Sequence, residues 1–169
     1  MRRILSLMLA SFLLPVTSAL AQRPADVVHW TAKGPSASVR AGGVARVQLT
    51  ADVEEGWHLY ALTQAPDGPP PMGIAVAKGQ PFTINVKDID APAPTVASDP
   101  NFGTETQYYE GKTTMNVPLA ARRDAKTGKY SVPIEVTFQV CSNRMCLRPF
   151  TQPLPVEVTV AAPAKEKTP

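Results

Sequence analysis

Apolar and polar residues alternate with a period of two along most of this chain. Five segments show the alternation clearly: residues 45–53, 82–86, 115–119, 132–140 and 154–160. Three shorter segments are weaker candidates of the same kind: residues 27–31, 57–62 and 74–77. This spacing predicts strands with one buried face, because successive side chains of a strand point to opposite sides of its sheet.

Turn-forming residues separate these segments, and no segment has the sustained 3.6-residue repeat of a helix. The 169 residues include 18 prolines and 10 glycines, which argues against a helical bundle. Seven or eight short strands at this spacing predict an all-β fold, an immunoglobulin-like antiparallel β-sandwich. Two long loops, at residues 63–73 and 91–111, are the expected places for function on such a scaffold.

The first 21 residues have the pattern of a secretory signal peptide. Basic residues precede an apolar segment at residues 4–16, and small residues stand at the two positions that a signal peptidase reads in 18–21. The apolar segment is shorter than the ~20 residues that span a bilayer. We therefore expect cleavage after Ala21, an exported domain over residues 22–162 that is not embedded in a membrane, and a disordered tail over residues 163–169.

The charge balance argues against nucleic acid as a partner. The formal net charge is +3, from 17 basic and 14 acidic side chains. Removal of Arg2 and Arg3 with the signal peptide would leave 15 basic side chains against the same 14 acidic ones. No stripe of basic residues stands behind the small excess, so no nucleic-acid partner is expected.

The two cysteines of the chain stand five residues apart, directly after the longest alternating segment. If residues 142–145 form a hairpin loop, Cys141 and Cys146 become cross-strand neighbours with Cα atoms about 4.5–5.5 Å apart, which a disulfide accepts. A disulfide across so short a loop adds only about 2 kcal/mol of stability. A redox pair, in contrast, needs a neighbouring thiol to resolve a mixed disulfide. The spacing leaves a redox pair, a structural disulfide and a metal site open.

Residues elsewhere in the sequence are candidates for the surroundings of the cysteines. Arg144 and Arg148 lie near the thiols in the sequence and could favour a thiolate. Phe102 stands in a polar loop, where an aromatic residue is either a lid or an anchor into the core. His58 and Tyr60 share one face of a short predicted strand, and the simplest alternative for His58 is a surface histidine.

Four parts of the sequence form a pattern when taken in order: Gly56-Trp57-His58-Leu59-Tyr60, the loop around Phe102, Tyr109-Glu110-Gly111-Lys112 leading to Val117-Pro118-Leu119, and Val136 to Pro149 with its C-x4-C-L-x-P ending. Together they resemble the N-terminal periplasmic domain of the thiol:disulfide interchange protein DsbD. The resemblance covers residues 27–160, which is nearly all of the expected mature chain.

The resemblance implies an immunoglobulin-like fold in which Cys141 and Cys146 are the redox pair, with Cys146 forming the mixed disulfide. Phe102 matches the aromatic residue of a cap loop that shields the pair. His58 and Tyr60 match flanking positions where aromatic residues are common, so the histidine is a departure from the family pattern.

The resemblance also implies a role and partners for the chain. It implies a periplasmic module without a cofactor, which passes electrons from a membrane thiol reductase to thioredoxin-like oxidoreductases. Family members continue into a membrane domain and a thioredoxin-like domain, so the reductase is expected to act in trans.

Two other classes of function stay open from the sequence. Cys141, Cys146 and Met145, with His58 or Met72, are soft ligands that suit Cu(I), and they would make the chain a copper-handling module. The second alternative is a non-redox interaction domain in which the disulfide is structural.

Overall fold

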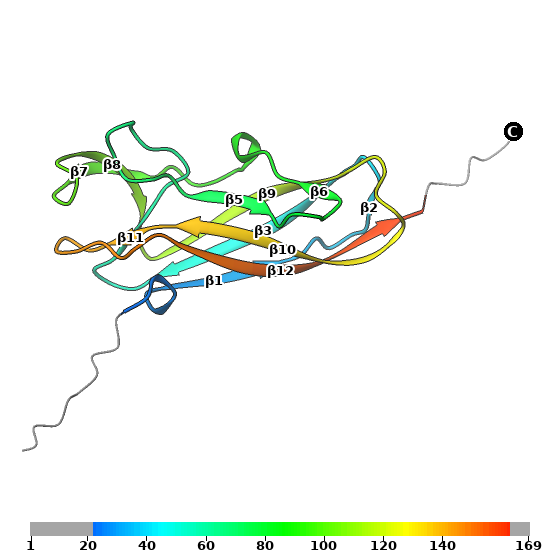
Figure 1. Cartoon of the computed structure of the whole chain (residues 1–169), viewed down its shortest axis with the longest axis horizontal. Coiled ribbons are helices and arrows are strands. Elements are labelled where there is room, and N and C mark those ends of the chain that lie inside the picture. The colour runs from blue at the N-terminus through cyan, green and yellow to red at the C-terminus, as the bar shows by residue number, and fades with distance from the viewer. Residues whose placement is uncertain (1–21, 163–169) are drawn as a thin grey trace, which may run out of the picture.

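The computed structural model describes residues 22–162, and strands form most of that range (Figure 1). The twelve strands are β1 (Val28–Lys33), β2 (Val39–Arg40), β3 (Val44–Val53), β4 (His58–Tyr60), β5 (Gly73–Val76), β6 (Phe82–Thr83), β7 (Thr95–Asp99), β8 (Thr104–Tyr109), β9 (Lys112–Ala121), β10 (Gly128–Phe138), β11 (Val140–Cys141) and β12 (Phe150–Ala161). Two 3-10 turns complete the elements: η1 (Pro24–Asp26) and η2 (Val86–Asp88). The expected signal peptide and tail lie outside the described residues.

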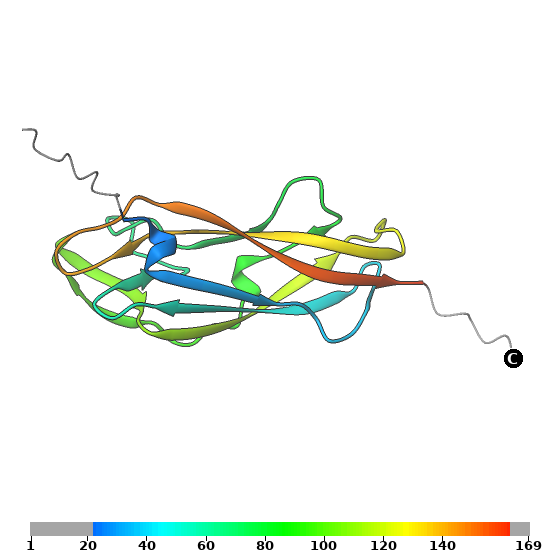
Figure 2. The same cartoon turned by 90° about the horizontal axis from the view of Figure 1, so that it is seen from below.

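Two four-stranded sheets form the body of the molecule as two layers (Figure 2). One sheet has the strand order β1-β3-β9-β6 and the other has the order β2-β12-β10-β5. The pairings in these sheets are antiparallel, except for a short parallel pairing between β2 and β12. The predicted all-β, immunoglobulin-like sandwich is confirmed. Within residues 22–162, no helix is long and apolar enough to cross a membrane.

The core lies between the two layers and is built from the alternating positions that the sequence shows. β3 and β9 contribute inward side chains such as Leu49 and Met115, and β10 contributes Ile134 and Phe138; all are at most 1% exposed. Burial of each such side chain stabilises the fold by roughly 1.5–3 kcal/mol. The ring of Trp30 on β1 lies 5.8 Å from the ring of Phe138, so the two layers are joined by aromatic packing as well.

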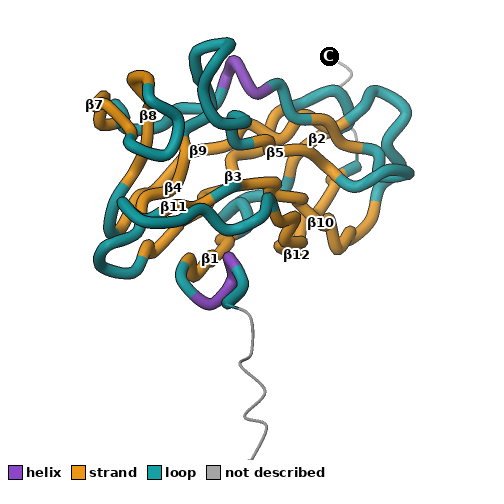
Figure 3. The backbone as a smooth tube through the Cα atoms, turned by 60° about the vertical axis from the view of Figure 1, so that its left-hand side comes forward, coloured by secondary structure: helices purple, strands orange, loops and turns teal. Residues whose placement is uncertain are grey.

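A third, smaller sheet extends one end of the sandwich, and its strand order is β11-β4-β8-β7 (Figures 1 and 3). The long strand predicted over residues 132–140 is interrupted at Gln139, where the chain leaves the partner strand β12 and begins to pair with β4 as β11. Between β8 and β9 the chain turns through Gly111, whose φ of 57° lies in the left-handed region that favours glycine. The third sheet is therefore joined to the sandwich directly, because β11 follows β10 after one residue and β8 leads into β9 through a short turn.

Two sequence predictions about individual segments are wrong. Residues 91–111 do not form a loop, because β7 and β8 pair there as an antiparallel hairpin. The polar composition of these strands hid them, since the side chains that they bury include a carboxylate and a threonine hydroxyl. The strand expected over residues 82–86 ends at Thr83, and the Asn85 side chain accepts a hydrogen bond from the amide of Lys87 to start η2.

Candidate functional site

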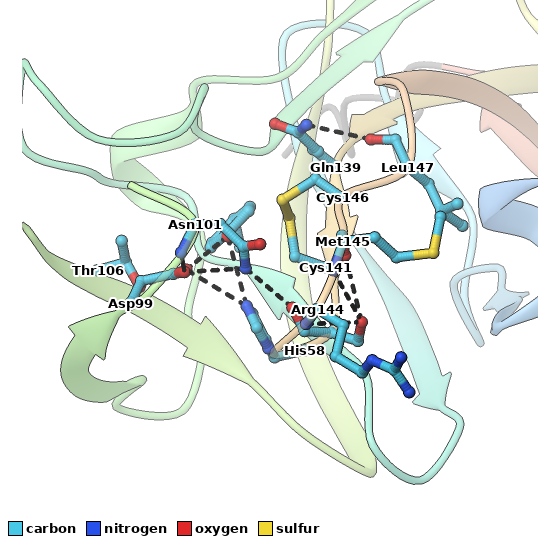
Figure 4. Close-up of a disulfide and its surroundings, with 12 residues drawn as sticks. His58, Asp99, Asn101, Thr106, Gln139, Cys141, Arg144, Met145, Cys146 and Leu147 are labelled. Atoms are coloured by element: carbon cyan, nitrogen blue, oxygen red, sulfur yellow. Dashed lines mark hydrogen bonds and ion pairs between the residues drawn. A yellow bond between two sulfur atoms is a disulfide. The ribbon is translucent and has the colours of Figure 1, made fainter. Parts of the chain in front are cut away.

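The two cysteines form a disulfide across a tight hairpin at the edge of the third sheet (Figure 4). The Ser142 amide donates a hydrogen bond of 2.8 Å to the Met145 carbonyl, and the Leu147 amide donates one of 3.0 Å to the Val140 carbonyl. The Cα atoms of Cys141 and Cys146 are 4.0 Å apart, somewhat closer than the cross-strand spacing predicts. The four-residue loop expected from the sequence is therefore present.

The two sulfur-bearing residues differ in their access to solvent. Cys141 is fully buried, whereas Cys146 is partly exposed at the end of the hairpin. A partner protein can therefore reach Cys146 more readily than Cys141. Arg144 and Arg148 are both exposed.

Strand register places the polar and aromatic candidates on one face of the third sheet. Cys141 lies directly opposite His58, and Tyr60 lies directly opposite Tyr108. Directly paired residues project to the same side of a sheet, so these four side chains share a face. Leu59, between His58 and Tyr60, projects to the other side and joins the core. We call the side with Cys141 the cysteine face.

The buried carboxylate of Asp99, at the end of β7, organises the cysteine face (Figure 4). Its Oδ2 accepts a hydrogen bond of 2.6 Å from the Tyr60 hydroxyl and one of 3.3 Å from the Thr106 hydroxyl. Its Oδ1 accepts hydrogen bonds from the backbone and side-chain nitrogens of Asn101, at 2.8 and 3.1 Å. The His58 Nε2 lies 3.4 Å from Asp99 Oδ2. A buried carboxylate is tolerable here because several donors replace its water.

These contacts decide which groups carry charge. Burial opposes ionisation of Asp99, but hydrogen bonds from Tyr60 and Asn101 and the charge of His58 lower the pKa of the carboxyl below its usual value. Burial and the hydrogen bond to Asp99 raise the pKa of the Tyr60 hydroxyl. At neutral pH the face therefore holds a carboxylate at Asp99 and a protonated phenol at Tyr60.

The turn from Asp99 to Gly103 connects this network to the cysteine hairpin. The Asn101 Nδ2 donates a hydrogen bond of 2.8 Å to the Ser142 carbonyl, next to Cys141. The Phe102 ring is partly buried and lies edge-on to the Tyr60 ring, with 5.7 Å between the ring centres. Phe102 thus packs on the cysteine face and does not belong to the sandwich core.

The structure brings the five candidate site residues of the sequence together: Cys141, Cys146, His58, Tyr60 and Phe102. The interpretation of His58 as a surface histidine is wrong, because it is only 6% exposed. Its ring packs between the rings of Tyr60 and Tyr108, at centre distances of 5.3 and 4.8 Å. The short strand β4 is covered on both sides, which the alternation of its sequence does not reveal.

The methionines considered as copper ligands lie in different environments. Met72 is 2% exposed and belongs to the sandwich core, while Met145 is 49% exposed on the hairpin. In the part of the chain that the structure describes, no group of three or more His, Cys, Asp or Glu side chains is placed to hold a metal ion.

Sequence reasoning missed four polar residues of the site: Asp99, Asn101, Thr106 and Gln139. The Gln139 side chain donates a hydrogen bond of 3.1 Å to the Leu147 carbonyl and so supports the far strand of the hairpin. Asp99 and Asn101 stand next to Phe102 in the sequence, so that aromatic residue was the available signal. Thr106 and Gln139 carry no signal, because only strand pairing brings them to the site.

Comparison with known proteins gives a family and a fold. A family model described as the N-terminal domain of the thiol:disulfide interchange protein DsbD matches residues 28–158. No curated protein matches the sequence. The crystal structure of the DsbD N-terminal domain from Neisseria meningitidis, in its reduced form, has a TM-score of 0.55 and 12% sequence identity, covering 82% of this chain and 90% of that one.

A second solved structure, the N-terminal periplasmic domain of ScsB from Proteus mirabilis, has a TM-score of 0.51 and 20% identity. The match covers 80% of this chain and 49% of that one, so the chain spans about half the length of the ScsB domain. At these identities the two structures show a common fold.

Proposed function

This chain belongs to the family of N-terminal domains of the thiol:disulfide interchange protein DsbD, and we propose that it is a periplasmic module that relays electrons through Cys141 and Cys146. A membrane thiol reductase supplies the electrons, and thioredoxin-like oxidoreductases accept them. The unequal burial of the two cysteines carries this proposal. A structural disulfide needs no accessible sulfur, whereas exchange needs one that a partner can reach.

The exchange follows from this asymmetry. In the reduced module, the Cys146 thiolate attacks a sulfur of the partner's disulfide, and the partner's second sulfur leaves as a thiolate. Cys141 then attacks the Cys146 sulfur and releases the partner. The module ends with the disulfide between Cys141 and Cys146, and the partner gains two electrons as a dithiol.

The Asp99–Gly103 turn protects the reduced cysteines between encounters with a partner protein. The Asp99–Gly103 turn lies against the hairpin through the Asn101–Ser142 hydrogen bond, and Phe102 covers Tyr60 beside it. We assign Phe102 the role of a lid that limits access of small oxidants to the reduced pair, because thiol oxidation follows exposure. A partner would displace this lid by supplying replacement contacts.

Trapping of the mixed disulfide tests the proposed function. The reduced Cys141→Ala and Cys146→Ala variants would each be mixed with an oxidised thioredoxin-like domain, and the products would be weighed by mass spectrometry. We expect Cys141→Ala to accumulate the mixed disulfide, because Cys146 attacks and cannot be released. The assigned roles are reversed if Cys146→Ala alone accumulates it.

Wild-type protein provides the control for both alternatives. If neither variant is trapped and the wild type does not exchange electrons with the partner, the redox proposal is wrong and the disulfide is structural. Stoichiometric retention of Cu(I) by the reduced protein, without exchange, would instead support a copper-handling module.

A further inference from the structure

His58 is a buried histidine on the cysteine face, in direct register with the buried cysteine. Its side chain and that of Cys141 emerge from paired positions of β4 and β11, so both lie on the same side of the sheet. The chain has two histidines in all, and the other one, His29, is exposed and contacts Glu54 at 2.8 Å. A buried imidazole beside a redox cysteine requires a physical explanation, because the core could take an aromatic ring there more easily.

The hydrogen bonds around His58 determine which of its nitrogens is free. The Tyr60 hydroxyl donates a hydrogen bond of 2.6 Å to Asp99, so its oxygen can only accept one from His58 Nε2, 3.4 Å away. The Asp99 carboxylate, also 3.4 Å from Nε2, is likewise an acceptor. When the imidazole is neutral, its hydrogen is therefore on Nε2 and its lone pair is on Nδ1. Among the described residues, Nδ1 makes no hydrogen bond.

We propose that His58 is the proton acceptor for Cys141 when that cysteine resolves a mixed disulfide. The inference rests on the proposed exchange function and deepens it. Cys141 needs such a group more than Cys146 does, because burial disfavours the charged thiolate that must attack. The arrangement has the three parts of an activated nucleophile: Cys141 as nucleophile, His58 as base, and Asp99 to orient the base.

The step balances as follows. The Cys141 thiol transfers its proton to His58 Nδ1, and its sulfur attacks the sulfur of Cys146. The bond between Cys146 and the partner's sulfur breaks, and the partner leaves as a thiolate. Cys141 and Cys146 are oxidised by two electrons, which stay with the partner. The positive charge that forms on His58 faces the Asp99 carboxylate, which stabilises it.

The neighbours of His58 come from its own strand and from the strands packed beside it, and they set the charge around its ring. Tyr60 on its own strand, Tyr108 on β8 and Asp99 on β7 lie close to the ring, and Cys141 on β11 lies opposite His58 in the strand register. Asp99 stays ionised and Tyr60 stays protonated near neutral pH, since their pKa values are lowered and raised respectively.

The test separates the resolving step from the first attack, with 5,5′-dithiobis(2-nitrobenzoate) as the oxidant. Reduced protein should release two equivalents of thionitrobenzoate: the first when Cys146 attacks the reagent, the second when Cys141 resolves the adduct. We expect His58→Gln to leave the first phase nearly unchanged. It should slow the second phase at least tenfold at pH 7, because a positioned base contributes roughly 10²–10⁴-fold. The difference should shrink as the pH rises, because hydroxide can then remove the thiol proton without His58.

Two further variants keep the test decisive. His29→Gln removes the other, exposed imidazole and should match the wild type across the pH range. His58→Tyr keeps a ring between Tyr60 and Tyr108 but has no base at neutral pH, so it should show the same slow second phase even if His58→Gln folds poorly. Equal second-phase pH profiles for wild type and a folded His58 variant would overturn the inference and leave the exchange function standing. Absence of a second phase in the wild type would overturn both.

Discussion

Truncation of Phe102 to alanine tests whether the Asp99–Gly103 turn shields the cysteines. The ring is only partly buried and its partner is Tyr60, at 5.7 Å between ring centres and nearly perpendicular. An edge-to-face pair adds about 0.5–1.5 kcal/mol beyond area burial. If that contact forms only when the turn is closed, its loss raises the open fraction roughly two- to tenfold. A fully buried phenylalanine would instead cost about 3–5 kcal/mol of global stability on truncation.

The assay compares alkylation of the reduced cysteines with thermal unfolding of the same protein. Phe102→Ala should react about fivefold faster with iodoacetamide while its melting temperature stays nearly constant, because local opening does not require unfolding. Tyr130→Ala is a matched control, since Tyr130 is also a partly buried ring in an edge-to-face pair, 5.4 Å from Phe82 in the sandwich. It should leave alkylation unchanged. Unchanged alkylation in Phe102→Ala, together with a large loss of stability, would refute the shielding role.

Two other predictions concern the polar contacts of the turn. Asn101→Ala removes the hydrogen bond to the Ser142 carbonyl, worth about 1 kcal/mol, and should speed alkylation of the reduced pair; Asn143→Ala, an exposed asparagine of the same hairpin, should not. The pKa of Asp99 is lowered in the fold from 3.8, so its contribution to stability is present above that pH and is lost as the pH falls through the folded value. Urea unfolding from pH 6 to pH 2 should therefore show a shallower acid loss for Asp99→Asn than for the wild type, and equal slopes would contradict the assigned network.

The strands of the sandwich were largely predictable because each one buries a single face. Leu49, Met115 and Ile134 stand in regular alternation with polar neighbours, and all three are buried as that pattern predicts. The cysteine hairpin was predictable for a similar reason, since the five-residue spacing of Cys141 and Cys146 makes a local turn that needs no distant partner.

The third sheet could not be read from the chain in the same way. β7 and β8 bury Asp99 and Thr106 beside the cysteine face, so their sequences look like a polar loop. The tertiary structure alone decides that β11 pairs with β4 and that a carboxylate 39 residues from Tyr60 accepts a hydrogen bond from its hydroxyl. The alternation of apolar and polar residues predicts which side chains are buried, because each strand buries its own apolar face. The alternation does not predict which donor a buried polar group will meet. That contact depends on the pairing register of strands that are far apart in the sequence.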